Sequence, residues 1–248
     1  MIKEKLDQYL EFDSNLIFNP GPSGLTVSRL TRIFGGAIRD IISEQPIHDI
    51  DILCGSRSYY VLKNILESKG YTYMDDLIHK DLGSLYRHIN VINEPHTWIK
   101  GSKIVQVIRP VIRNFPKRGT HPTQNEKIYK DGFTNLIRNV DISCCGVSWD
   151  GTTLFENYPS AILNCLTKTF KINKSALMYS PERISQRKYK LESRGWVELN
   201  DVSIERDLKI SVLLDEKISK YQCVKEYKSD DKTEKDYISV FHGEIPTF

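Results

Sequence analysis

The stretch Arg32-Ile-Phe-Gly-Gly-Ala-Ile-Arg-Asp40, followed by the acid pair of Asp49-Ile-Asp51, decides the fold of this chain. Two adjacent glycines let the backbone approach a phosphate with no Cβ in the way. Residues 38–44 predict a short helix whose N-terminal end faces that phosphate, and Pro46 ends it. Residues 48–53 are β-branched and apolar apart from their acids, which predicts a strand with both carboxylates on one face. We therefore expect a phosphate cradle directly before a carboxylate pair that can bind divalent metal ions.

Composition places the chain among ordinary globular proteins. It has 248 residues, of which 40% are hydrophobic and 27% charged, and a net charge of +3 is too small to indicate a partner. No apolar run is long enough to span a membrane and the first residues lack the apolar core of a signal peptide, so we expect a cytoplasmic protein with no membrane partner. Its five cysteines form no C-x-x-C pair, which favours reduced thiols over a zinc site.

Turn residues and hydrophobic periodicity divide the chain into four expected parts. They are an N-terminal lead-in at 1–23, a head domain at 24–160, a helical neck at 161–199 and an extension at 200–248 whose role the sequence does not indicate. Within them, the patterns predict a helix at 58–69, a buried strand at 104–112, a loop at 114–125, a hairpin whose strands 141–149 and 152–156 meet at a two-residue turn, and a helix from 181 to the glycine at 195.

The glycine turn and the D-x-D strand resemble the head domain of class II tRNA nucleotidyltransferases (CCA-adding enzymes) and bacterial poly(A) polymerases. The signature of that family is a Gly-Gly-x-Val-Arg-Asp turn followed by a D-x-D strand. The resemblance implies an α+β fold, with a polymerase-β-like nucleotidyltransferase head of mixed, mostly antiparallel sheet flanked by helices, and a short helical neck. It also implies that Asp49 and Asp51 bind two Mg²⁺ ions and that Gly35, Gly36 and Arg39 contact the phosphates of a nucleoside triphosphate (NTP).

Two further segments resemble the family with departures. In the family's acid-Val-x-x-x-Arg strand, Gln106 stands in place of the acid, and Arg109 is a candidate for nucleotide contact. In the family's Arg-Arg-Asp-Phe-Thr-Ile-Asn-Ala-Leu segment, the Asp falls on Asp141, which we expect to complete the catalytic set. Asn139 and Val140 replace the two arginines, so the contacts of that pair do not carry over.

The helix expected from residue 181 resembles the family's neck, which opens with Glu-Asp-Pro-x-Arg. Arg183 keeps the arginine with which the family reads a cytosine or adenine edge, whereas Ser180 replaces the aspartate and retains only the helix cap. Arg183, Arg187, Lys190 and Arg194 form a basic stripe on one helix face. Such a stripe is either a solvated surface or a phosphate contact, and Arg183 and Arg187 are the candidates for nucleotide binding.

These features predict a metal-dependent nucleotidyltransferase that moves a nucleoside monophosphate from ATP or CTP to an acceptor hydroxyl. The leading acceptor is an RNA 3′ end, that of a tRNA or of another RNA. Two alternatives stay open: a toxin-like transferase acting on a protein hydroxyl, and a catalytically silent nucleotide- or RNA-binding module, which the loss of an acid at Gln106 favours. The residues leave the base preference and the oligomeric state undetermined.

Overall fold

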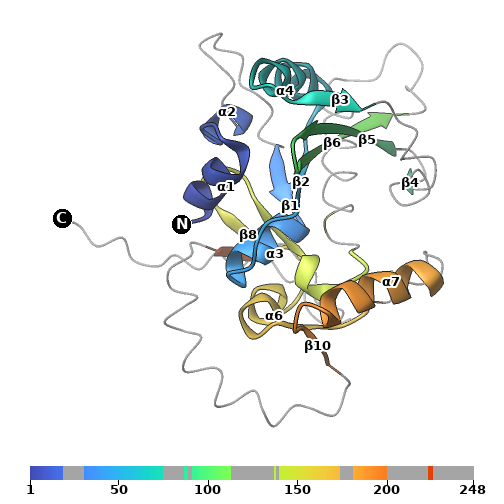
Figure 1. Ribbon diagram of the computed structural model, residues 1–248. Coiled ribbons are helices and arrows are strands. Elements are labelled where there is room, and N and C mark those ends of the chain that lie inside the picture. Colours follow the sequence, from blue (N-terminus) through green and yellow to red (C-terminus); the bar gives the residue numbers. More distant parts are fainter. Residues whose placement is uncertain are drawn as a thin grey trace.

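The computed structural model describes residues 1–18, 31–74, 87–88, 91–112, 137, 140–173, 181–199 and 223–225 (Figure 1). Its helices are α1 Ile2–Leu10, α2 Asn15–Phe18, α3 Gly36–Ile42, α4 Ser56–Ser68, α6 Ala161–Thr167 and α7 Pro181–Glu192, with a 3₁₀ turn, η3, at Ser143–Cys145. Its strands are β1 Arg32–Phe34, β2 Asp49–Leu53, β3 Thr72–Met74, β4 Arg87–His88, β5 Val91–Lys100, β6 Lys103–Ile112, β7 Val147–Trp149, β8 Leu154–Glu156, β9 Thr169–Phe170, β10 Val197–Glu198 and β11 Cys223–Lys225.

Within the described residues, one sheet of nine strands forms the centre of the fold, in the order β11-β8-β7-β1-β2-β6-β5-β3 with β4 paired to β5. β2 runs parallel to β6 and β11 runs parallel to β8, while every other pairing in this sheet is antiparallel. The expected α+β class with a mixed, mostly antiparallel sheet is therefore confirmed. The register sets Asp51 beside Phe34 of β1 on one side and Gln106 of β6 on the other.

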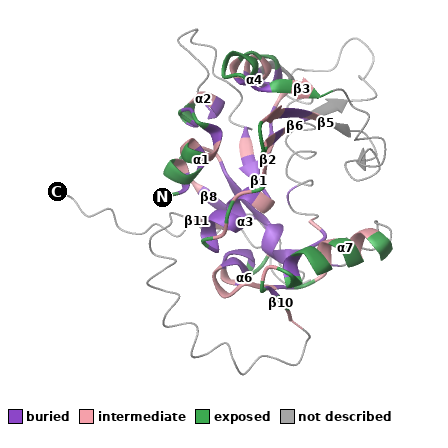
Figure 2. Cartoon of the chain, viewed as in Figure 1, coloured by how far each residue is buried: buried purple, intermediate pink, exposed green. Residues whose placement is uncertain are grey.

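The core lies between one face of this sheet and the helices. Ile50 and Ile52 lie on this face and are fully buried with Val105 and Val107 of β6. Buried residues are concentrated in α3 and the strands beside it, whereas α7 is largely exposed (Figure 2). Because side chains alternate along a strand, Asp49 and Asp51 point to the opposite face. The packed face thus holds β2 in place while the other face presents its carboxylates.

The N-terminal segment, expected as a peripheral lead-in, contributes to this core. Leu6 and Leu10 of α1 and Ile17 of α2 are buried in the same hydrophobic cluster as the sheet. Tyr9 ties the helix to the sheet, because its hydroxyl donates to the carbonyl of His48 (2.7 Å) and accepts from the backbone N–H of Ile104 (2.9 Å).

The hairpin after Asp141 is present but differs from its predicted form. β7 and β8 pair antiparallel, yet the loop between Trp149 and Leu154 has four residues instead of two, because the Asp150 carboxylate accepts the backbone N–H groups of Thr152 and Thr153. The first part of the predicted strand is the turn η3. The Ser143 hydroxyl stabilises it by accepting from the Lys171 backbone N–H and the Asn164 side chain.

Five predicted elements are confirmed, with ends within three residues of the predicted ones. They are the helices at 36–42, 56–68 and 181–192 and the strands at 49–53 and 103–112. β9 and β10 add a small parallel sheet that the sequence did not predict.

Within the described residues, no helix has the length and apolar character to cross a membrane. Several expectations lie outside the described residues: the loop at 114–125, the departure at 139, the cap at 180, and nearly all of 200–248.

Candidate functional site

The two glycines make the turn between β1 and α3. Gly35 has φ 70° and ψ −128°, a conformation that side chains rarely adopt, and its carbonyl accepts the Arg39 N–H as α3 begins. The Gly35 N–H donates to the Val147 carbonyl (3.0 Å), so it is occupied within the sheet. Gly36 is the first helical residue, and its N–H is one of those that the helix itself leaves unbonded. Two backbone amides were expected to bind a phosphate. That of Gly35 is bonded within the sheet, so the amide of Gly36 is the one left to bind it.

The two carboxylates of β2 lie against this turn. A Cβ added to Gly35 would stand 3.8 Å from Asp51 Oδ2, and one added to Gly36 would stand 3.7 Å from Asp49 Oδ1. The structure thus brings together four of the expected site residues, Gly35, Gly36, Asp49 and Asp51. The space that glycine keeps open is bordered by carboxylate oxygens.

Asp51 has the electrostatics of a cation ligand. Its Oδ1 atom is buried and has no hydrogen-bond partner among the described residues. Burial and the negative charge of Asp49 raise the pKa of Asp51 to about 8. Within the described part of the chain, no three His, Cys, Asp or Glu side chains are grouped to hold a metal ion. A cation here would therefore rest on the two aspartates, with other ligands from water or substrate, as Mg²⁺ commonly binds.

Among the described residues, neither Gln106, which stands in place of the family's acid, nor Asp141, the expected substitute, contacts the aspartate pair. Gln106 stands beside Asp51 in the register, and its amide lies 3.5 Å from the Thr97 hydroxyl. Asp141 is buried, and its Oδ2 lies 2.9 Å from Nη1 of Arg187. Asp141 is thus engaged with a helix of the neck region, and we infer a positioning role for it.

Arg39, expected at the phosphates, lies beside the glycine turn but is bound inside the protein. It is 7% exposed, and its Nε and Nη2 donate to Asp40 Oδ1 at 2.8 and 2.6 Å. Its Nη2 would lie 3.7 Å from a Cβ on Gly36. Asp40, whose other oxygen lies 3.5 Å from Arg194 Nη1, links α3 to the residues that follow α7.

The basic stripe of α7 contacts the rest of the protein. Arg187 pairs with Asp141, Arg194 pairs with Asp40, and both arginines are partly buried. The positive charges of Arg187 and then Lys190 oppose the rise in the pKa of Asp51, which places both cations within electrostatic reach of β2. Arg183 is half-buried one turn earlier on the same helix face. Part of the stripe is therefore engaged within the protein and is not simply a solvated surface.

Arg109 is the predicted residue that the structure sets apart. Residues 106 and 109 alternate to opposite faces of β6, and Arg109 stacks its guanidinium on the Tyr59 ring of α4 at 4.9 Å. Its Nη1 lies 3.5 Å from the Tyr60 hydroxyl. These contacts are on the helix-covered face, away from the side chains of Asp49 and Asp51.

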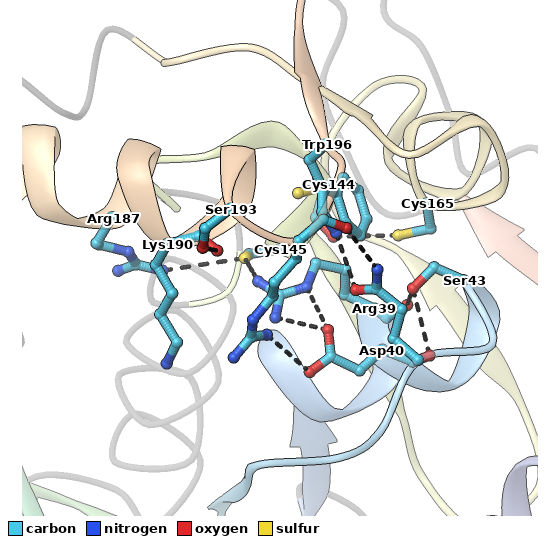
Figure 3. Close-up of polar contacts among 12 residues, drawn as sticks. Arg39, Asp40, Ser43, Cys144, Cys145, Cys165, Arg187, Lys190, Ser193 and Trp196 are labelled. Carbon is cyan, nitrogen blue, oxygen red and sulfur yellow. Dashed lines mark hydrogen bonds and ion pairs between the residues drawn. The ribbon is translucent and has the colours of Figure 1, made fainter.

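The sequence did not predict the contacts of two side chains, Gln45 and Cys145, that hold this arrangement. Gln45, after α3, accepts a hydrogen bond from the Trp196 indole (3.0 Å) and donates one to the Arg194 carbonyl (3.0 Å). Cys145 lies between two arginine side chains (Figure 3). The partners are separated by 42 to 151 residues along the chain, so local patterns carry no signal for them.

Comparison with solved structures finds partial matches to several tRNA-processing proteins. A tRNA-processing enzyme with CTP has a TM-score of 0.44 at 15% identity, over 74% of this chain and 43% of that one. The CCA-adding enzyme of Bacillus stearothermophilus in complex with CTP gives 0.40 at 13%, over 81% and 40%. A tRNA nucleotidyltransferase complexed with a primer tRNA and an incoming ATP analogue gives 0.42 at 14%, over 75% and 47%. This chain therefore spans less than half the length of each. No protein-family model matches the sequence, and no curated protein matches it.

Proposed function

We propose that this protein is a metal-dependent nucleotidyltransferase that transfers a nucleoside monophosphate from ATP or CTP to the 3′ hydroxyl of an RNA. One observation carries the proposal: a glycine turn that admits a phosphate lies against two carboxylates, one of which has a buried oxygen without a hydrogen-bond partner among the described residues. A buried carboxylate without a donor costs free energy unless a cation compensates it. The turn and the acids together fit a nucleotide bound with Mg²⁺.

In this proposal Asp49 and Asp51 hold the Mg²⁺ ions. Bound there, Mg²⁺ supplies positive charge to the phosphates and lowers the pKa of an attacking hydroxyl. Gly36 donates its N–H to a phosphate oxygen, and Gly35 supplies the backbone conformation that keeps the cradle open. Arg187 and Lys190 add positive potential over β2, where negative charge accumulates on the departing pyrophosphate. Arg183 is the candidate for contact with the base.

A second candidate is a silent nucleotide-binding module. The observation that favours it is the lack of a third acid at the pair: the amide Gln106 stands in its place and lies near Thr97, and Asp141, the expected substitute, is paired with Arg187. A transfer assay separates the candidates. Purified protein is incubated with Mg²⁺, a small-RNA pool that includes tRNAs lacking CCA, and each α-labelled NTP in turn.

We expect label in RNA with wild-type protein and none with Asp49→Ala/Asp51→Ala. Label on protein instead would assign a protein hydroxyl as acceptor. Nucleotide binding without any labelled product, and unchanged by removal of metal, would support the silent module and overturn the transferase.

Replacing Gly36 with Ala tests the cradle itself. The new methyl group meets Arg39 Nη2 and Asp49 Oδ1 at 3.7 Å, which is ordinary contact, and Gly36 does not need a positive φ. The variant should therefore fold as well as wild type or gain up to about 1 kcal/mol in the helix. Because the methyl group fills the space proposed for a phosphate, nucleotide affinity should fall by about tenfold, or about 1.4 kcal/mol. Urea unfolding and calorimetric binding of ATP and CTP measure both effects.

The matched variant is Gly35→Ala, which should lose about 1–3 kcal/mol of stability because Gly35 has φ 70°. Unchanged nucleotide affinity in a folded Gly36→Ala protein would place the phosphates elsewhere.

A further inference from the structure

Cys145 lies where two arginine side chains converge. Nη1 of Arg39, from α3, is 3.4 Å from the sulfur, and Nη2 of Arg187, from α7, is 3.9 Å from it (Figure 3). Cys145 itself is 3% exposed. The proposed chemistry has no use for this sulfur, yet side chains from the helix after the glycine turn and from the helix of the basic stripe both contact it.

The two guanidinium groups that reach Cys145 favour an ionised sulfur. Arg39 donates to Asp40 and Arg187 forms an ion pair with Asp141, and each directs one further nitrogen at the sulfur. A guanidinium group can only donate, and a thiolate is a stronger acceptor for it than a neutral thiol. A thiolate at Cys145 therefore supplies an acceptor at the point where Arg39 and Arg187 both reach.

The surroundings also distinguish Cys145 from the other thiols. A hydrogen bond from Cys144 outweighs the effect of burial and, with Arg39 and Arg187, lowers the pKa of Cys145 to about 6. Burial raises the pKa of each of the other four, Cys54, Cys144, Cys165 and Cys223. The charged and titratable groups around Cys145 come from five elements: Arg39 and Asp40 of α3, Asp51 of β2, Asp141 and Cys144 beside it, Cys165 of α6, and Arg187, Lys190 and Arg194 of the α7 region.

We propose that Cys145 is a thiolate in the folded protein and that its negative charge positions α7 against α3 by holding Arg187 and Arg39 together. Cys145 is thus a positioning residue, not a catalytic one. Only its consequence for catalysis rests on the proposed function: α7 carries the arginines assigned to the nucleotide, so a weakened link should raise the nucleotide KM more than it lowers kcat.

The thiolate can be observed directly, without nucleotide. The ultraviolet absorbance of a thiolate is followed as a pH titration of the wild type and of Cys145→Ser, and the difference isolates this one sulfur. We expect one thiolate to appear with a midpoint near pH 6 in the wild type and to be absent from the variant. No ionisation below about pH 8 in the wild type, or the same ionisation in both proteins, would overturn the proposal.

A rescue by charge tests the positioning role. Thermal unfolding is compared at about pH 8 for Cys145→Ser and Cys145→Asp, because a carboxylate accepts two guanidinium groups whereas a serine hydroxyl is neutral. We expect Cys145→Asp to unfold at the higher temperature of the two. If the site only needs a small uncharged side chain, the order reverses and the proposal fails.

The control is the same pair of changes at Cys165, a buried thiol that donates to the Cys144 carbonyl. At this position the Asp variant should unfold at a lower temperature than the Ser variant. Since a lowered pKa stabilises the folded state only while the group is ionised, the advantage of wild type over Cys145→Ser should also shrink as the pH falls through about 6. None of these measurements requires a transferase, so they can fail or succeed independently of the proposed function.

Discussion

Replacing Asp51 with Asn is expected to abolish nucleotidyl transfer and, without metal, to make the protein more stable. The loss of activity should be about a thousandfold or more, equal to about 4 kcal/mol of transition-state stabilisation, because a neutral amide is a poor Mg²⁺ ligand. The gain in stability follows from the buried Oδ1 atom, which has no hydrogen-bond partner among the described residues, and from the neighbouring Asp49 charge. Each kcal/mol gained should raise the unfolding midpoint by about 2–4 °C.

The stability of the metal-free protein should depend on pH through Asp51. Because the pKa of Asp51 is raised to about 8, the proton it binds favours the folded state. That contribution is fully present below the ordinary carboxyl pKa of 3.8 and is lost as the pH rises through about 8. Metal-free wild type should therefore lose stability over this range, and Asp51→Asn should lack that part of the slope.

Mg²⁺ should reverse the loss, because it competes with the proton for the same oxygens. At about pH 8, added Mg²⁺ should raise the unfolding midpoint of the wild type but not that of Asp51→Asn. Glu67→Gln serves as the control, since this α4 side chain is exposed and should change stability by less than about 0.5 kcal/mol. If Mg²⁺ leaves the wild-type midpoint unchanged, the two aspartates do not form a metal site.

The part of the site that lies close together in sequence was predictable. Residues 32–53 form a strand, a turn, a helix and a strand whose apolar period fixes which side chains face the core. That is enough to place Asp49 and Asp51 on one face and the glycines beside them. The α+β fold class, by contrast, was implied by the resemblance that the glycine turn and the D-x-D strand carry.

What the sequence could not predict depends on partners far along the chain. The pattern predicts α7 and its basic stripe, but whether Arg187 meets water, a phosphate or Asp141 is decided by packing between residues 46 positions apart. Arg109 has the charge expected of a nucleotide contact, yet its position in β6 directs its side chain to Tyr59. The turn η3 replaces a strand because the Ser143 hydroxyl binds groups 21 and 28 residues away.

Replacing Asp40 with Ala is expected to cost about 3–5 kcal/mol of stability, the second large effect. Asp40 is 1% exposed and accepts two hydrogen bonds from Arg39, which is itself buried. Removing one member of a buried ion pair leaves the other charge without compensation, which costs more than the pair contributes. Urea unfolding measures the change, and the protein should be assayed at a temperature where the variant is still folded.

The comparison with Arg194→Ala shows which partner matters. Arg194 lies 3.5 Å from the second Asp40 oxygen and is 16% exposed, so its loss leaves the Arg39 pair intact and should cost about 1 kcal/mol or less. If Asp40 contacted substrate instead, Asp40→Ala would lose activity while keeping its stability, and Arg194→Ala would have no related effect. Because the Asp40 carboxylate joins α3 to the end of α7, we expect both variants to weaken nucleotide binding in proportion to their loss of stability. A stable but inactive Asp40→Ala protein would instead indicate that Asp40 acts in the reaction and does not serve to hold α3 against the end of α7.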